Sequence, residues 1–381
     1  MPRVDWSASL ARVLHLGVKE LRSLWRDRLM LLFVVWAFSG AIYTAATSAP
    51  ERLNRAPIAV VDEDQSALSQ RIVSAFYPPH FTPPQLIDLQ GMDAGMDAGR
   101  YTFALDIPPN FQRDVLAGRQ PAIQLNVDAT QISQGFVGAA AVQTIVMGEV
   151  AEFLADERRI STSPIELADR YRFNPTLNEG WFTATVELIN QVTLLSIILT
   201  GAALIREREH GTLEHLLVLP LRAGEIMLAK VWSMGLVVLA ATGLSLWGVV
   251  HQAVGMPLGG SVGLFLFGCT LHLFATTSMG IYMGTVARSM PQLGLLMILV
   301  LLPLEMLSGG MTPRESMPEL VRTVMLAAPT THFVALAQAI LYRGAGPHTV
   351  WPQLLALAAI GAVFFVAAWM RFRRAVTEMQ G

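Results

Sequence analysis

The sequence is poor in cysteine and in charged residues. Cys269 is its only cysteine and lies in an apolar run, which excludes an intrachain disulfide and a cysteine-cluster metal site. Only 15% of the 381 residues are charged and 53% are hydrophobic, whereas an average soluble domain is about 25% charged. This balance indicates lipid as the main solvent. The formal net charge of -2 leaves no global basic surface, so composition argues against a nucleic-acid partner.

Lysine is equally scarce. The chain has only Lys19 and Lys230, and neither follows a glycine. The Gly-Lys-Ser/Thr core of a nucleotide-binding loop is therefore absent. If the protein performs ATP-driven work, another chain supplies the ATPase.

Long uncharged runs predict membrane spans. A bilayer core about 30 Å thick needs roughly 20 apolar residues, and runs of this size without Asp, Glu, Lys or Arg occupy 29–49, 231–250, 262–287 and 351–370. Two further runs are less pure, because 181–205 carries Glu187 and the short run 293–308 carries Pro303 and Glu305. We expect all six to span. The first run is longer than the apolar part of a cleavable signal peptide.

Positive charge near the span ends predicts the orientation, because cytoplasmic loops retain Lys and Arg. Residues 1–28 contain six of them and the loop 206–230 contains four, whereas 251–261 contains none. We therefore expect both termini in the cytoplasm, with a short tail at 375–381. Residues 1–28 show apolar side chains at helical spacing, which predicts an amphipathic interfacial helix. Pro329 interrupts 311–343, which we expect to form outer re-entrant or interfacial helices.

Residues 50–180 differ from the rest and predict an external domain. They hold 17 acidic residues and 10 arginines, and their length suffices for one small core. Apolar runs and period-two alternation predict strands at 57–61, 103–107 and 123–127, with helices at 65–76 and 135–155. The tandem Gly-Met-Asp-Ala at 91–98 is expected to form a loop. Neither metal-ligand spacing nor a nucleophile triad stands out, so we predict no catalytic residues and no metal site.

A polar stripe marks the second predicted span. Thr183, Glu187, Asn190 and Gln191 recur at i, i+4, i+7 and i+8, on one helix face. A charge inside the membrane normally faces protein or a water-filled path, so Glu187 and Glu305 are candidates for a translocation path. Hydrogen bonding between helices at a subunit interface explains the stripe equally well. His272, alone in the fourth span, is interpreted as a packing residue.

One cytoplasmic segment carries a family resemblance. Ile205-Arg206-Glu207-Arg208-Glu209-His210-Gly211-Thr212-Leu213-Glu214, followed by Leu219-Pro220-Leu221, resembles the first cytoplasmic loop of ABC transporter type-2 permeases. The similarity extends to Asn174-Pro175, to Val60-Val61-Asp62-Glu63-Asp64 and to Ser308-Gly309 with Pro313, and so covers nearly the whole chain. The look-alikes are bacterial inner-membrane subunits of multidrug and small-molecule exporters with a large periplasmic domain.

The resemblance implies roles for particular residues. It assigns Glu207, Arg208, Glu209, Gly211, Thr212, Leu213 and Glu214 to a coupling helix that docks on a separate ATPase subunit, with ATP and Mg bound there and no cofactor on this chain. It also implies a homo- or heterodimer of permeases in the lipid bilayer, with helices two and five near the central path, where the polar stripe and Glu305 lie. A periplasmic adaptor protein is an optional partner.

The sequence therefore predicts an α-helical polytopic membrane protein with six transmembrane helices and a small α/β periplasmic domain. The predicted function is that of the permease subunit of an ATP-driven exporter of drugs or other amphiphilic small molecules, without enzymatic activity of its own. The alternative is a membrane-anchored sensor or assembly factor whose external domain binds a ligand or partner. An intramembrane enzyme ranks below both, because no catalytic set is recognisable.

Overall fold

The computed structural model describes residues 6–48, 55–78, 80–128, 132–158, 173–174, 178–209 and 221–380. The chain divides into two compact units. One combines Met1–Ala49 with Tyr171–Gly381, and the other is Pro50–Arg170. The first is called the membrane unit and the second the external unit.

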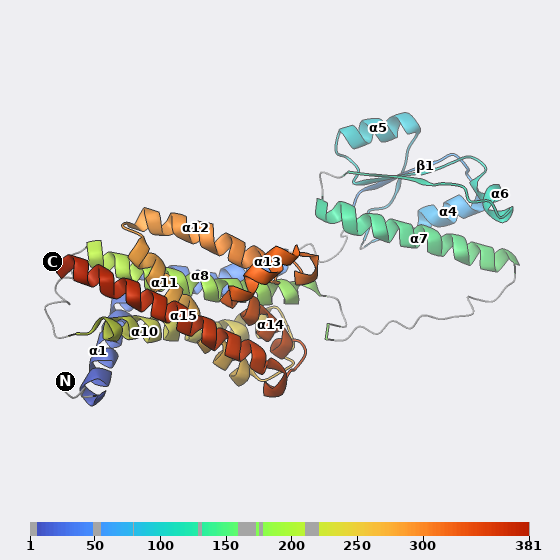
Figure 1. Cartoon of the computed structure of the whole chain (residues 1–381). Coiled ribbons are helices and arrows are strands. Elements are labelled where there is room, and N and C mark those ends of the chain that lie inside the picture. The colour runs from blue at the N-terminus through green and yellow to red at the C-terminus, as the bar shows by residue number, and fades with distance from the viewer. Residues whose placement is uncertain are drawn as a thin grey trace. The chain divides into compact units, whose positions relative to one another are not determined.

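The external unit is built on a four-stranded mixed sheet. Its strands are β1 (Ile58–Asp62), β2 (Gln85–Leu86), β3 (Phe103–Ile107) and β4 (Gln124–Val127), in the order β2-β1-β3-β4. β1 pairs in parallel with β2 and β3, and β3 pairs antiparallel with β4, so that Ile58 lies opposite Phe103 and Phe103 opposite Val127. The helices are α4 (Ala67–Ala75), α5 (Leu89–Asp97), α6 (Phe111–Leu116) and α7 (Ile132–Arg158) (Figure 1).

Both faces of the sheet are covered, as the alternation along β1 and β3 requires. Ile58, Val60 and Leu105 belong to the core shared with α4, α6 and α7, whereas Ala59 and Ala104 pack with side chains of α5. The stretch Gly138–Asp156 of α7 is long and apolar enough to cross a membrane. Its buried side chains instead pack in the core of the external unit, so we assign it to this unit and not to the spans.

The prediction of a loop at 91–98 is wrong, because most of this segment forms α5. The carboxylate of Asp88 caps the helix by accepting from the backbone N–H of Gly91 at 2.7 Å. Met92 and Gly95 lie three residues apart on the buried face, and Gly95 leaves room for the ring of Tyr101. The two glycines lower helix propensity, and tertiary packing overrides that preference here.

Arg71 ties α4 to α7 on the surface of the external unit. Its guanidinium pairs with Glu149 and Glu152 at 2.8 Å and with Asp156 at 3.0 Å. Hydrogen bonds to these three carboxylates raise the pKa of Arg71. Three of the acidic residues of this unit therefore pair with one arginine.

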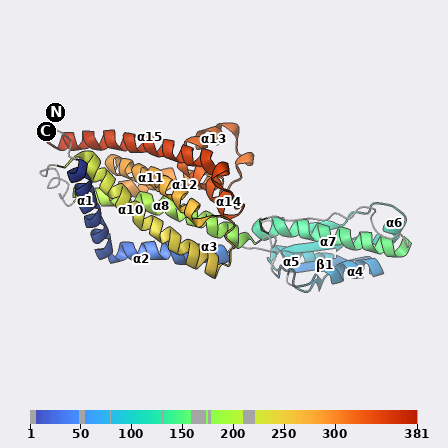
Figure 2. The ribbon, with the colours of Figure 1, turned by 90° about the horizontal axis from the view of Figure 1, so that it is seen from below.

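The membrane unit contains the predicted spans. Its helices are α1 (Trp6–Arg26), α2 (Arg28–Trp36), the π-helical turn η1 (Ala37–Ala41), α3 (Ile42–Ser48), α8 (Glu179–Glu209), α10 (Ala223–Ser245), the π-helical stretch η2 (Leu246–Ala253), α11 (Val262–Val286), α12 (Met290–Met306), η3 (Arg314–Ser316), α13 (Glu319–Val324), η4 (Met325–Ala327), α14 (Pro329–Leu341) and α15 (Pro347–Gln380). Figures 1 and 2 show α2, α3, α8, α10, α11, α12 and α15 running side by side along a bundle. Helix α1 crosses one end of that bundle, and the C-terminal end of α15 lies at the same end.

Six helices of the described residues are long and apolar enough to cross a membrane, one of them the stretch of α7. The other five are 28–48, 179–209, 223–253, 262–286 and 347–374, and each overlaps a predicted span. The sixth predicted span, 293–308, corresponds to α12. At 17 residues it is about 25 Å long, slightly shorter than a bilayer core. The chain is thus a polytopic helical membrane protein with a small mixed α/β domain.

Several helices run beyond their predicted ends. The predicted coupling loop 206–230 is shorter, because α8 continues to Glu209 and α10 begins at Ala223. The predicted tail 375–381 largely continues α15, which ends at Gln380. Charged residues at both places remain helical because a helix can leave the apolar layer without unwinding.

Pro329 breaks the segment predicted to be re-entrant. The helices on either side of Ala328 are bent by 89°, which suits a broken span or a re-entrant loop. Pro329 occupies the first turn of α14, where its missing N–H leaves no helical bond unmade. The break is present where the sequence predicts it, and the re-entrant topology stays a prediction.

Helices α8 and α11 form the centre of the membrane unit. Within their most apolar windows 78% and 67% of the residues are buried, against 17% for α15. Small residues bring the two helices together, as is common in membranes. A Cβ added at Gly280 would lie 2.7 Å from the carbonyl oxygen of Ile197, and one added at Gly284 would lie 3.2 Å from that of Gly201. Helices α8 and α11 are therefore in close contact around Ile197 and Gly201.

Candidate functional site

Four charged side chains meet where the last turn of α8 approaches α1 and α10. Lys230 is 2% exposed, and its Nζ lies 3.0 Å from Oε1 of Glu20 and 2.8 Å from Oε2 of Glu207. Lys19 Nζ lies 2.7 Å from the other carboxylate oxygen of Glu207 and 3.4 Å from Oε1 of Glu20. We call these four residues the charge cluster. It contains both lysines of the chain.

The charge cluster balances two ammonium groups against two carboxylates. An isolated buried charge costs several kcal/mol, so each member depends on the others. Burial alone would lower the pKa of Lys19, but its hydrogen bond to Glu207 and the charge of that carboxylate outweigh burial and raise the pKa. A raised lysine pKa means that this pair stabilises the fold below pH 10.5 and that the contribution is lost as the pH rises through the raised value.

A second set of bonds docks α1 on α10. Glu225, in the first turn of α10, accepts from Ser9 at 2.6 Å and from the guanidinium of Arg12 at 2.7 Å. The indole Nε1 of Trp232 donates to the carbonyl oxygen of Val13 at 3.2 Å. The amphipathic helix predicted to lie on the membrane surface is therefore held by specific polar contacts with α10.

The last turn of α8 also bonds to two connections between helices. Arg206 pairs at 2.6 Å with Asp27, which caps α2. Arg208 donates to the carbonyl oxygen of Ala287 at 2.8 Å, and Glu209 accepts from the N–H of Met290 at 3.3 Å. This turn thus connects with α1, α2 and α10 and with the connection between α11 and α12.

The predicted coupling residues fall into two groups. Glu207, Arg208 and Glu209 are described, and the carboxylate of Glu207 is turned inward to the two lysines. Gly211, Thr212, Leu213 and Glu214 lie outside the described residues. The role of all seven in docking an ATPase stays a prediction.

The polar stripe lies at the opposite end of α8. Gln191 is buried and donates from Nε2 to Oε1 of Glu187 at 2.5 Å. Glu305, on α12, is half-buried, and its carboxyl group interacts electrostatically with that of Glu187. The structure thus brings together Glu187, Gln191 and Glu305. Thr183 and Asn190 are half-buried, and within the described residues neither forms a hydrogen bond with these three side chains.

His272 has the packing role that its solitary position predicts. Its Nε2 lies 2.9 Å from Oγ1 of Thr193, and its ring stacks on Phe333 with 4.3 Å between the ring centres. Both partners are buried. This arrangement joins α8, α11 and α14.

Sequence reasoning missed the partners of Glu207. Lys230 offered a signal, since it is one of only two lysines and immediately precedes an uncharged run. Its partner Glu20 lies 210 residues away in the sequence, and no local spacing could identify it.

Removing the ammonium of Lys230 should weaken the membrane unit more than removing that of Lys19. Lys230→Met leaves two buried carboxylates with only the half-exposed Lys19 to neutralise them, and we expect a loss of about 3 to 5 kcal/mol. Lys19 is 48% exposed, so Lys19→Met should cost about 1 kcal/mol or less. The melting temperature of the purified protein in detergent measures both. Equal melting temperatures for the two variants would contradict the buried pairing.

Comparison with known proteins agrees with this architecture. A model of the family described as ABC-2 family transporter protein matches residues 26–370. The chain is 60% identical over 370 residues to the inner membrane transport permease YhhJ of Escherichia coli (strain K12), covering 97% of this chain and 99% of that protein. It is 27% identical over 361 residues to the probable multidrug ABC transporter permease YbhR of the same organism, covering 94% and 97%. The chain therefore belongs to the ABC-2 transporter family, as a multi-pass permease of the inner membrane.

Proposed function

We propose that this permease exports drugs or other amphiphilic small molecules across the inner membrane, working as a dimer with separate ATPase subunits. Permeases of ABC transporters pair with ATPase subunits, and the likeness to the probable multidrug permease YbhR supports the substrate class. The observation that carries the proposal is the bonding of the last turn of α8. That turn contains the first residues of the predicted coupling segment. Its side chains bond to α1, to α10, to the N-terminus of α2 and to the connection between α11 and α12.

Helix α8 is suited to carry motion from the coupling segment to the polar stripe. Glu187 and Glu207 are 20 positions apart on one continuous helix, a rise of about 30 Å. Because α8 is largely buried and tightly packed on α11, a push at one end moves the whole helix and does not bend it. In this mechanism Glu207 has an internal role. It fastens the coupling segment to α1 and α10, while the residues that follow contact the ATPase.

The orientation in this proposal has both termini in the cytoplasm. Six Lys and Arg residues lie in 1–28, and the charge cluster lies at the same end of the bundle. The positive-inside rule favours that end as cytoplasmic. The polar stripe then lies in the outer half of the bilayer, at a translocation path, at the contact between two copies, or at both.

Reversing one charge in the coupling segment should release the ATPase. The permease is co-expressed with candidate ATPase subunits and purified in detergent. We expect Glu214→Arg to lower the retained ATPase by about tenfold or more, because a like charge at a polar contact is strongly unfavourable.

Glu315→Arg is the matched control, since Glu315 is exposed and belongs to the segment 311–343 that is predicted to lie on the outer side, and it should retain the ATPase. Undiminished retention by Glu214→Arg would remove the coupling segment from the contact. Failure of the wild type to retain any candidate, under conditions that preserve known transporter complexes, would overturn the exporter proposal.

A disulfide test addresses the polar stripe. The single cysteine is replaced by Cys269→Ala, and Asn190→Cys is then oxidised in native membranes. If the stripe lies where two copies meet, Asn190→Cys should form a disulfide-linked dimer on a gel, while Val363→Cys, at a 68% exposed position of α15, should not. A dimer formed only by Val363→Cys would place the contact on α15 and refute this role of the stripe.

A further inference from the structure

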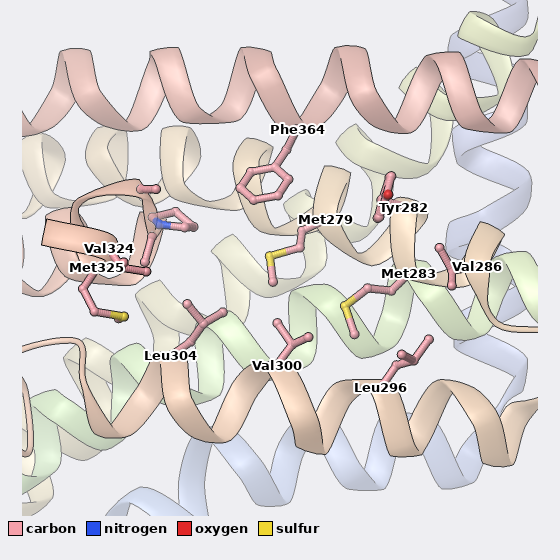
Figure 3. A pocket seen from close by; sticks show the side chains of 13 residues that line it. Met279, Tyr282, Met283, Val286, Leu296, Val300, Leu304, Val324, Met325 and Phe364 are labelled. Carbon is pink, nitrogen blue, oxygen red and sulfur yellow. The ribbon is translucent and has the colours of Figure 1, made fainter. Parts of the chain in front are cut away.

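An apolar cavity of about 400 Å³ lies between α11, α12 and α15 (Figure 3). Helix α11 contributes Met279, Met283 and Val286, and α12 contributes Leu296, Val300 and Leu304. Figure 3 shows α12 and α15 on opposite sides of the cavity, with the α11 side chains between them and Met325 at one end. The volume lies within the range of about 300 to 1,000 Å³ that is usual for small-molecule sites.

The cavity is an elongated slot. The three α12 residues recur at i, i+4 and i+8 and form one ridge along the helix, about 12 Å long. The three α11 residues recur at i, i+4 and i+7 and form the facing ridge. Two parallel apolar ridges leave a narrow groove along the helix axes, a shape that suits an extended hydrocarbon chain.

The lining favours hydrocarbon over water. All lining side chains are apolar except Tyr282, which contributes a hydroxyl group. A water molecule needs two to four polar partners, and the walls do not supply them. An empty slot would leave its walls without dispersion contacts on one side. Methionine adapts its shape to an occupant, and three methionines line the slot.

A cation stands beside one end of the slot. The guanidinium of Arg371 lies 5.9 Å from the centre of the Tyr282 ring. Arg371 is exposed, and no carboxylate within the described ranges forms an ion pair with it. Arg371 lies seven residues after Phe364 on α15, a rise of about 10 Å along the helix, and Phe364 lines the slot. An apolar slot with an unpaired cation at its mouth matches an amphiphile with an anionic head group.

We propose that this cavity binds one acyl chain of an anionic phospholipid, with the phosphate of its head group at Arg371. The bound chain fills the space between α12 and α15 and so supports α12, the helix that carries Glu305. The inference concerns a site for a resident lipid and does not rest on the exporter proposal or on the polar stripe.

Native mass spectrometry of the purified full chain tests the site. The protein is stripped of lipid in detergent and incubated with palmitoyl-oleoyl phosphatidylglycerol or with phosphatidylcholine of the same chains. The wild type should retain one phosphatidylglycerol in preference to phosphatidylcholine. Val300→Phe fills the slot and should abolish retention of both lipids. Arg371→Gln should lower the preference for phosphatidylglycerol by about fivefold.

Two matched variants serve as controls. Leu299→Phe enlarges a neighbouring side chain of α12 that is 69% exposed and outside the slot. Arg373→Gln removes a guanidinium that lies over Trp369, 5.9 Å from the ring centre. Both should retain lipid as the wild type does. If Val300→Phe does not fold, Val300→Leu adds one methylene and should show a smaller loss. Equal retention by wild type and the Val300 variants, or an unchanged preference in Arg371→Gln, would overturn the proposal.

Discussion

The membrane unit depends on the neutralisation of Lys230. A lysine that is 2% exposed must be paired, and its partners Glu20 and Glu207 come from α1 and α8. This requirement fixes three segments of the chain that are far apart in sequence. Membrane helices have little hydrophobic reason to associate, so polar pairs and close packing decide which helices meet. The charge cluster supplies the polar pairing at one end of α8, and the glycines of α8 and α11 allow the two helices to pack closely around Gly201.

This arrangement gives α8 a central position in the proposed mechanism. The C-terminal end of α8 contains the first residues of the coupling segment. Its N-terminal half carries Glu187, whose carboxyl group interacts with that of Glu305 on α12. In the window where 78% of its residues are buried, α8 is enclosed by its neighbours, and the proposed mechanism takes it to move as one body. Helix α12 differs, because it is short and many of its side chains are exposed. We infer that α12 is the helix that moves relative to α8 during transport. The proposed lipid between α12 and α15 would then influence how easily α12 moves.

The sequence predicted the spans well because a membrane span is a local property. A run without charge, about 20 residues long, identifies itself without knowledge of its neighbours, as 262–287 did for α11. The break at Pro329 was equally local, since it follows from the chemistry of proline. The charge cluster could not be predicted, because Lys230 and Glu20 are 210 positions apart. The helix at 89–97 was missed because its two glycines lower helix propensity, and the Asp88 cap together with packing around Tyr101 offsets that loss.

The central claim is that motion passes from the coupling segment, which the charge cluster fastens to α1 and α10, along α8 to the polar stripe. Pulsed electron paramagnetic resonance measures it, with spin labels at Asn190→Cys in both copies of the assembled transporter, with and without ATP. The account predicts that ATP changes the distance between the labels in the wild type. It further predicts that Lys230→Met abolishes this change, at a temperature where the variant is folded and retains the ATPase. An equal ATP-dependent change in Lys230→Met would contradict the claim.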